Sequence, residues 1–296
     1  MSFFIKKLSI IGVGLIGGSL ARALKERDCV GEVVGINRTR ASLEKARELG
    51  VIDALTTDPV AGVRGANMVL VATPVRTIVP IVRAAAPGLM PGAVVTDAGS
   101  VKGRIVAECE AAMPQGVHFV GGHPIAGTEH SGVEASFATL FEGSRTILTP
   151  TPNTAADALE QVSIVWEAVG SHVEIMDPMH HDQVLAATSH LPHLMAYNIV
   201  KTLSDLEHDV QSEVFRFAAS GFRDFTRIAS SDPTMWRDIC LENRAAILEM
   251  IGRFGRDLDF LRDRVAAGDG ETLHRIFAQS RETRDRVLRI NKGGRT

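Results

Sequence analysis

The stretch that decides the fold lies close to the N-terminus and reads Ile10-Ile11-Gly12-Val13-Gly14-Leu15-Ile16-Gly17-Gly18-Ser19. Gly12, Gly14 and Gly17 form a Gly-x-Gly-x-x-Gly pattern between a short apolar run and a helical stretch. In this context the glycines permit a tight turn, a close approach of the backbone to a pyrophosphate, and close packing of helix on strand. A helix is expected over residues 19–27, and its N-terminus, together with Leu15 and Ile16 in the turn before it, offers free N–H groups to the phosphates. We therefore expect NAD(P) binding here, with FAD binding or a plain glycine-rich turn as the alternatives.

Length and composition indicate a compact globular chain. Its 296 residues are enough for two domains of ordinary size, and 45% are hydrophobic against 23% charged. The net charge of −3 argues against a nucleic-acid partner. Three widely spaced cysteines predict neither a disulfide framework nor a CxxC site, and they fit a cytoplasmic location. The sequence shows no signal-peptide pattern and no membrane-spanning run, so we expect no membrane partner.

The first half of the chain alternates between predicted strands and helices. Short apolar runs, typical of strands buried on both faces, occupy residues 8–11, 32–36, 68–72, 93–97, 118–121, 145–148 and 172–175. Helical stretches at 41–49, 78–86, 101–113 and 155–169 separate several of them. This alternation predicts an α/β Rossmann-type domain over residues 1–176, with a doubly wound, mostly parallel sheet. Its ligands should gather at the carboxyl ends of the strands.

From residue 177 onward the strand signal disappears. Asp177 followed by Pro178 favours a helix start, and helices are expected over 178–189, 193–209, 211–219, 233–267 and 271–290. The fourth of these has more apolar surface, at helical spacing, than one chain easily covers. We expect residues 177–296 to form an all-α substrate-binding and dimerisation domain that makes a homodimer through its C-terminal helices. The alternative is a long helix lying on its own domain.

The end of the second predicted strand bears on the choice of cofactor. An acid that binds the ribose hydroxyls usually stands about 20 residues after the glycine motif, whereas this sequence has Asn37 there. Asn37 does not repel a 2′-phosphate, and Arg38 or Arg40 could pair with one, which favours NADP or dual use. The alternative is that these arginines are solvated and NAD binds. Thr73, in the turn that ends the third strand, is a candidate contact for the nicotinamide half, or part of a plain turn.

Two polar residues follow later strands at the same edge of the sheet. Ser100 stands where a helix opens and is a natural N-cap, at a position that could also hold an anionic substrate. His123 lies between paired glycines and Pro124, and we expect it to be an acid–base group rather than a structural histidine.

The helical half supplies further candidates in Ser189-His190-Leu191-Pro192-His193, where the proline interrupts a helical pattern. A metal site formed by His190 and His193 with His180 and His181 is disfavoured, because no carboxylate or cysteine cluster completes it. Arg223 and Arg227 lie in an otherwise apolar stretch. They suggest carboxylate recognition, with salt bridges to nearby acids as the alternative.

Taken together, these motifs resemble the prephenate/arogenate dehydrogenase family of tyrosine biosynthesis. The resemblance covers nearly the whole chain and rests on the glycine motif together with Asp97-Ala98-Gly99-Ser100-Val101-Lys102, Gly122-His123-Pro124-Ile125-Ala126-Gly127, Ser189-His190-Leu191-Pro192-His193, Asp224-Phe225-Thr226-Arg227-Ile228-Ala229 and Trp236-Arg237-Asp238. It implies a Rossmann domain followed by a helical dimerisation domain.

The resemblance also implies a reaction and roles for residues. Hydride passes from the hydroxyl-bearing ring carbon of prephenate or arogenate to NAD(P), carbon dioxide leaves, and no metal is needed because aromatisation drives decarboxylation. His123 matches the family's catalytic histidine, and Ser100 matches the serine that hydrogen-bonds both this histidine and the cofactor region. His193 and Arg227 match substrate-binding residues, with Ser189 and His190 beside them.

Two other kinds of protein fit parts of the sequence. A dehydrogenase of the β-hydroxyacid type would carry a lysine after a glycine tract, but no glycine tract leads into Asn198 and Lys201. A non-catalytic dinucleotide sensor would need neither His123 nor Arg227. No residue distinguishes prephenate from arogenate.

Overall fold

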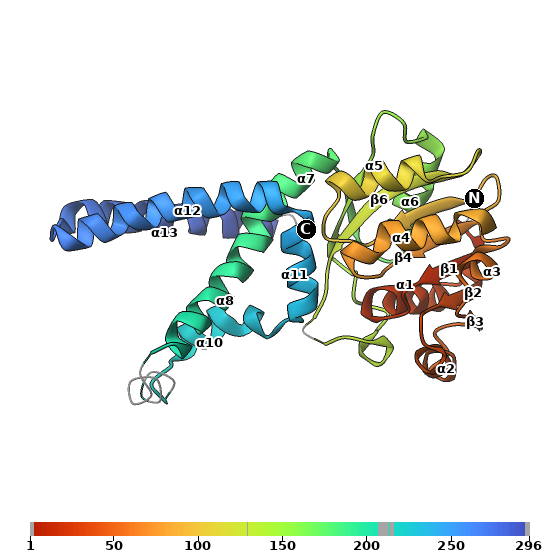
Figure 1. Ribbon diagram of the computed structural model, residues 1–296, viewed down its shortest axis with the longest axis horizontal. Helices are drawn as coiled ribbons and strands as arrows, with labels where there is room; N and C mark the ends of the chain where they lie inside the picture. The colour runs from red at the N-terminus through yellow and green to blue at the C-terminus, as the bar shows by residue number, and fades with distance from the viewer. Residues whose placement is uncertain (1–2, 129, 207–212, 214–215, 294–296) are drawn as a thin grey trace. The chain divides into compact units, whose positions relative to one another are not determined.

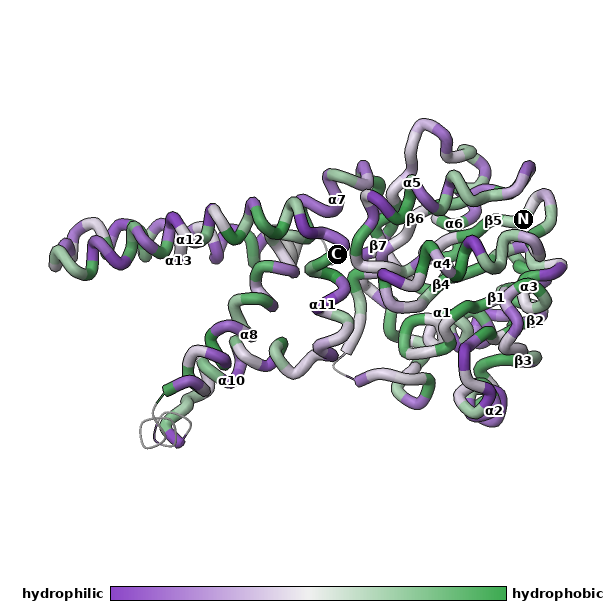
Figure 2. Tube along the Cα trace, viewed as in Figure 1, coloured by the Kyte–Doolittle hydropathy of each residue, from purple (hydrophilic) through white to green (hydrophobic). Residues whose placement is uncertain are grey.

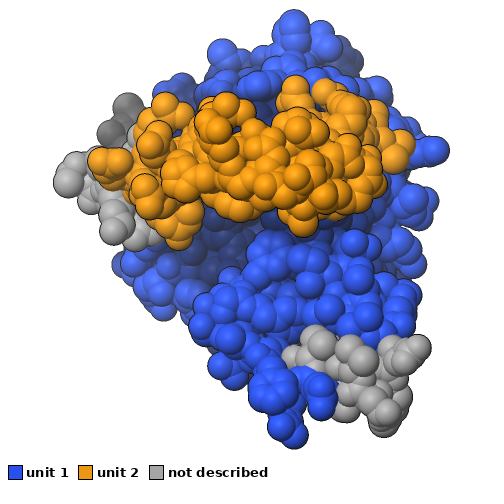
Figure 3. All heavy atoms as spheres, turned by 90° about the vertical axis from the view of Figure 1, so that its left-hand side faces the viewer, with its two compact units in different colours: residues 1–244 blue, residues 245–296 orange. Residues whose placement is uncertain are grey.

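The computed structural model describes residues 3–128, 130–206, 213 and 216–293 (Figure 1). It divides into two compact units, Met1–Arg244 and Ala245–Thr296, which Figure 3 colours separately. The first unit holds the sheet and the helices that follow it as far as residue 242. The helix expected over residues 211–219 falls partly outside the described residues.

One eight-stranded sheet forms the centre of the first unit, in the order β3-β2-β1-β4-β5-β6-β7-β8. Neighbouring strands are parallel except β6 and β7, which are antiparallel. The expected α/β Rossmann-type fold is therefore confirmed. The chain reverses its direction of winding between β1 and β4, which is where such sheets bind ligands. The strands are β1 (Ile5–Ile11), β2 (Val30–Ile36), β3 (Ala54–Thr56), β4 (Met68–Val71), β5 (Val94–Asp97), β6 (His118–Ile125), β7 (Arg145–Thr149) and β8 (His172–Ile175).

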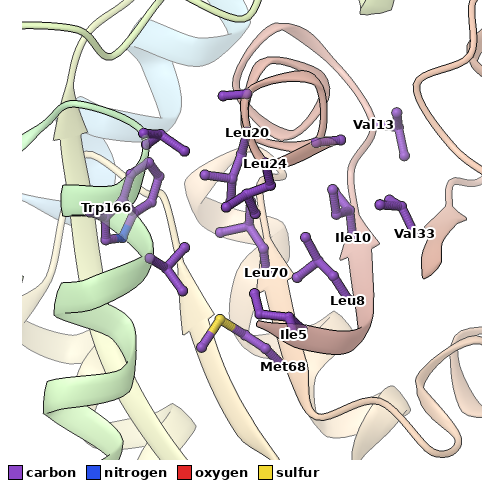
Figure 4. Close-up of a cluster of buried hydrophobic side chains, with 14 of the residues drawn as sticks. Ile5, Leu8, Ile10, Val13, Leu20, Leu24, Val33, Met68, Leu70 and Trp166 are labelled. Atoms are coloured by element: carbon purple, nitrogen blue, oxygen red, sulfur yellow. The ribbon is translucent and has the colours of Figure 1, made fainter. Parts of the chain in front are cut away.

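Helices cover both faces of the sheet because its central strands are apolar on both faces. Along β1, Leu8 and Ile10 belong to one buried cluster and Ile11 to the other, as the two-residue period of a strand requires. Figure 4 shows the first cluster, where Trp166 packs on the same face as Leu8. This face is covered by α1 (Leu15–Glu26), α2 (Arg40–Glu48) and α6 (Ala156–Ala168), and the other by α3 (Pro59–Val63), α4 (Val75–Ala85) and α5 (Gly103–Ala111).

The glycine motif forms the turn between β1 and α1. Gly12 has φ of 97°, and a Cβ there would lie 2.4 Å from the Ala72 carbonyl oxygen. A Cβ at Gly17 would lie 2.5 Å from the Gly12 carbonyl oxygen, so helix and strand pack too closely for a side chain. A Cβ at Gly14 would meet nothing within 4 Å. As the motif predicts, Gly12 permits the tight turn, Gly14 leaves space for a ligand to approach the backbone, and Gly17 allows the helix to pack closely on the strand.

A run of helices completes the first unit. It begins with α7 (Pro178–Leu185), whose first turn is capped by the Asp177 carboxylate, as expected. A π-helical turn (Ala186–His190) then leads directly into α8 (Leu191–Ser204), in which Pro192 is the second residue. Because Pro192 has no N–H to donate, a carbonyl of the preceding turn lacks its usual helical partner, and the helix widens there. The remaining elements are α10 (Ser220–Thr226), a 3₁₀ turn (Arg227–Ser230) and α11 (Pro233–Glu242).

The single helix expected over residues 233–267 is wrong. The chain forms α11 and then α12 (Arg244–Ala266), with a break at Asn243, where φ is −100° and ψ is 35°. The reason is tertiary: the buried Asn243 amide donates to the Asp182 carbonyl oxygen at 2.8 Å and to His190 Nδ1 at 3.1 Å. Helical periodicity in the sequence does not show that Asn243 makes these two hydrogen bonds.

The second unit contains the rest of α12 and all of α13 (Gly270–Gly293). Both helices carry hydrophobic residues among hydrophilic ones in Figure 2. Large apolar side chains remain exposed on α12, including Leu248, Ile251, Phe254 and Leu258. No helix among the described residues is long and apolar enough to cross a membrane.

Two glycine variants test the packing of the turn. Gly17→Ala should lower the free energy of unfolding by about 1–3 kcal/mol, because the added methyl group meets a backbone oxygen that cannot move freely. Gly14→Ala has open space and should stay within about 0.5 kcal/mol of the parent protein. Urea unfolding measures both, and equal losses would contradict the packing assigned to Gly17.

Candidate active site

The turn after β1 and the end of β2 form a cradle for a dinucleotide. Asn37 Oδ1 accepts a hydrogen bond from Val13 N at 2.8 Å, and Asn37 Nδ2 donates to Ser42 Oγ at 3.0 Å. The Asn37 side chain therefore holds the glycine turn against β2. The start of α1 has no side-chain cap, so no side chain occupies its first N–H groups, and the space beside Gly14 is open.

Other residues around this cradle also fit a bound dinucleotide. Thr73 Oγ1 is buried and has no hydrogen-bond partner among the residues described, so it is available to a ligand. Arg38 is exposed, and Arg40 is exposed with its Nε 2.9 Å from Glu44 Oε1. Both arginines follow the strand at the end where the ribose of the ligand would lie.

The start of α5 differs from the expectation for Ser100. The helix begins at Gly103, so Ser100 is not its N-cap, and the anion at this helix start is the carboxylate of Asp182 on α7. Asp182 Oδ1 accepts from Lys102 N and Oδ2 accepts from Gly103 N, both at 2.8 Å. Ser100 is half-buried, and its hydroxyl makes no hydrogen bond to any described residue; the expected bond to His123 is not formed, since His123 Nδ1 contacts His181 instead.

A buried ion pair fixes the loop between β5 and α5. The Lys102 ammonium pairs with Asp97 Oδ2, and both side chains are fully buried. Lys102 Nζ also donates to the Gly122 carbonyl oxygen at 2.8 Å, and Asp97 Oδ1 accepts from Gly122 N at 3.1 Å. The pair thereby joins β5 to the β6 residue that immediately precedes His123.

His123 lies within a strand and not after one. β6 continues to Ile125, four residues beyond the expected end, because His123 pairs with Ile147 of the antiparallel strand β7. The half-buried imidazole has its Nδ1 at 2.9 Å from His181 Nε2. His181 Nδ1 in turn lies 2.8 Å from Asp182 Oδ1. Three side chains thus form a continuous chain, Asp182–His181–His123.

Burial lowers the pKa of His123 well below its usual range, and the nearby His181 and Lys102 add to this effect. Burial also lowers the pKa of His181, although its hydrogen bond to Asp182 opposes the change. Both rings are therefore neutral at neutral pH, and a neutral His123 can accept a proton.

The helical residues expected to bind substrate gather near α11. The His193 ring stacks on Trp236 with centroids 3.8 Å apart, and His193 Nδ1 donates to the Ser189 carbonyl oxygen at 2.8 Å. Burial lowers the pKa of His193, as does the charge of Arg227, an exposed residue in the 3₁₀ turn that packs on α8. The structure thus brings His193, Ser189 and Arg227 together.

His190 points into the interior instead. It is buried, burial lowers its pKa to about 4, and its Nδ1 accepts from Asn243. Its Nε2 is buried with no hydrogen-bond partner in the described part of the chain.

Sequence reasoning missed the parts that His181, Asp182 and Asn243 play at this site. Asp182 lies 80 residues from Lys102 in the sequence, and Asn243 lies 61 residues from Asp182. The only local signal was the carboxylate directly after His181, which can orient a histidine.

A Rossmann-type sheet, an open glycine cradle and a neutral histidine define a nucleotide-dependent oxidoreductase. Residues 20–175 match the nucleotide-binding domain of prephenate dehydrogenase, and residues 177–279 match its dimerization domain. The chain belongs to the prephenate dehydrogenase family.

Individual relatives agree with this assignment. The chain is 39% identical to the cyclohexadienyl dehydrogenase of Zymomonas mobilis over 94% of this chain and 95% of that protein. It superposes on Aquifex aeolicus prephenate dehydrogenase, solved with hydroxyphenyl propionate and NAD+, with a TM-score of 0.90, 40% identity and coverage of 97% and 100% of the two chains. For Synechocystis arogenate dehydrogenase the TM-score is 0.81, with 30% identity and coverage of 95% and 99%. Family membership decides against the β-hydroxyacid dehydrogenase alternative.

The buried pair can be tested by removing one partner. Lys102→Met leaves the Asp97 carboxylate buried without its counter-ion, which should lower the free energy of unfolding by about 3–5 kcal/mol. Lys201→Met is the matched control, since Lys201 pairs with Asp205 on an exposed helix face and should cost about 0.5 kcal/mol or less. Chemical denaturation compares the two variants. A small loss for Lys102→Met would show that Asp97 does not depend on this lysine.

Proposed function

We propose that this protein catalyses the NAD(P)-dependent oxidative decarboxylation of prephenate, arogenate or both, giving 4-hydroxyphenylpyruvate or tyrosine. The observation that carries the proposal is the neutral imidazole of His123, held by His181 at the ligand-binding edge of a dinucleotide-binding sheet. The reaction needs a base at the ring hydroxyl, and such an imidazole meets that need.

Each site residue has a role in this proposal. His123 is the catalytic base, and Ser100, whose hydroxyl has no described partner, hydrogen-bonds to substrate or cofactor beside it. Arg227 binds a substrate carboxylate, because a guanidinium pairs bidentately with that group. His193 also binds substrate, and the stacked Trp236 ring and the Ser189 carbonyl fix its orientation.

Ser189 and His190 have lesser roles at the same place. The Ser189 carbonyl orients His193, and we assign its hydroxyl to the binding of substrate beside that ring. His190 is buried and its Nδ1 accepts from Asn243, so its role is to support the helices behind the substrate position and not to contact the substrate directly.

The cofactor residues are those of the cradle: Gly12, Gly14, Leu15, Ile16, Gly17, Asn37, Arg38, Arg40 and Thr73. When bound there, NAD(P)+ supplies the acceptor for the two electrons removed from the substrate ring. We propose NADP or dual use. The support is that Asn37 carries no charge to repel a 2′-phosphate, while Arg38 and Arg40 are exposed beside it.

We also propose that residues 1–176 form the NAD(P)-binding domain and residues 177–296 the substrate-binding and dimerisation domain. The spans matched by the two family models support this division. A homodimer through the C-terminal helices would cover the exposed apolar side chains of α12. The free thiols of Cys29, Cys109 and Cys240 support a cytoplasmic location.

The activity is tested with four reaction mixtures. The purified protein is given NAD+ or NADP+, each with prephenate or with arogenate, and nucleotide reduction is followed. We expect turnover in at least one mixture, and the pattern identifies the substrate and the cofactor. Folded protein that binds nucleotide but turns over in none of the four would overturn the proposal.

The base is tested by His123→Asn. This variant keeps a polar side chain but cannot accept the proton, so kcat should fall by roughly 10²-fold or more while the dissociation constant of the cofactor stays unchanged. Steady-state kinetics and a nucleotide titration measure the two effects. Turnover like that of the parent protein would remove His123 from its role.

Carboxylate binding is tested by Arg227→Ala. The loss of a charge-assisted, bidentate contact should raise the KM for substrate about 10-fold or more, with a smaller change in kcat. Arg64→Ala, which removes an exposed arginine directly after α3, serves as the control. An unchanged KM for Arg227→Ala would assign the carboxylate to another group.

A further inference from the structure

The His181–Asp182 pair lies directly behind His123. We propose that it is a positioning pair, which holds the proton of His123 on Nδ1 and leaves Nε2 free to take the proton of the substrate hydroxyl. This inference rests on the proposed function for the identity of the substrate, but the proton position is a property of the protein alone.

Asp182 provides the fixed end of the chain. Its carboxylate is almost fully buried and accepts three hydrogen bonds, from Lys102 N, Gly103 N and His181 Nδ1, each at 2.8 Å. Two of these donors are backbone N–H groups at the start of α5, which favour a negative charge there. An ionised carboxylate can only accept, so the proton of His181 must be on its Nδ1.

His181 transmits this constraint to His123. Because the buried His181 ring is neutral and carries its proton on Nδ1, its Nε2 presents a lone pair. The 2.9 Å contact with His123 Nδ1 is then a hydrogen bond only if His123 donates. A neutral His123 that is protonated on Nδ1 has a bare Nε2.

The same chain keeps its hydrogen bonds when the proton is transferred. When His123 Nε2 takes the hydroxyl proton, the O–H bond breaks, an N–H bond forms, and the electron pair stays on the substrate oxygen. The resulting imidazolium still donates from Nδ1 to His181. The charged groups around it are the Asp182 carboxylate beyond His181 and the Lys102 ammonium, which Asp97 neutralises.

Variants of His181 separate the two roles of Asp182, which caps α5 and also orients His123 through His181. Asp182 would keep its two hydrogen bonds to α5 if His181 were replaced, so the helix remains capped. His181→Phe keeps a ring of similar size but removes both nitrogens. His181→Gln keeps an acceptor toward His123 and a donor toward Asp182. His180→Phe places the same new side chain at the adjacent exposed residue and is the matched control.

Kinetics distinguish positioning from a general loss of structure. We expect His181→Phe to lower kcat about 10- to 100-fold, with little change in the KM for substrate or the dissociation constant of the cofactor. His181→Gln should recover much of the loss, and His180→Phe should match the parent protein. A parental kcat for His181→Phe, or a Gln variant as impaired as the Phe variant, would overturn the proposal.

A spectroscopic measurement decides the proton position without any activity. In ¹⁵N NMR of the histidine-labelled protein, the His123 ring signals are identified by their loss in His123→Asn. They should show a protonated Nδ1 and an unprotonated Nε2 near neutral pH. A protonated Nε2 would overturn the inference even if His181→Phe did not fold. Failure of the proposed function would instead appear as silence in all four reaction mixtures, whatever the spectrum.

Discussion

The carboxylate of Asp182 is the interaction on which the rest of the site depends. It caps α5 from another helix, because Lys102 and Gly103 donate their N–H groups to it. It also holds His181, and through His181 it holds His123. The carbonyl of the same residue accepts from Asn243, which ends α11. A single residue on α7 thus connects the sheet edge to the helices that carry the proposed substrate-binding residues.

The buried charges at this edge of the sheet are neutralised by other protein groups and not by water. Lys102 uses its backbone N–H for Asp182 and its ammonium for Asp97 and the Gly122 carbonyl. A buried charge without a partner would destabilise the fold, so Lys102 and Asp97 each depend on the other being present. The result is a rigid frame around a histidine whose burial keeps it neutral. Rigid support of this kind holds a base in the geometry that proton transfer requires.

Much of the fold could be predicted from the sequence because its signals are local. Apolar runs mark strands buried on both faces, and the glycine motif defines the turn after β1 by its own steric needs. The candidate His123 was also recognisable, since its neighbours form a short motif. The helix cap at α5 and the break at Asn243 could not be predicted, because their partners lie far away in the sequence. The role of His181 could not be predicted either, because its contact with His123 joins residues that are 58 positions apart in the sequence.

The most direct test of this account is a crystal structure of the protein with NAD+ and hydroxyphenyl propionate, an aromatic analogue of the proposed products. The account predicts that the phenol oxygen lies about 2.6–3.2 Å from His123 Nε2, that His123 Nδ1 remains on His181, and that the carboxylate faces His193 and Arg227. A phenol oxygen bound away from His123, or a carboxylate in its place, would contradict the central claim that this histidine is the base.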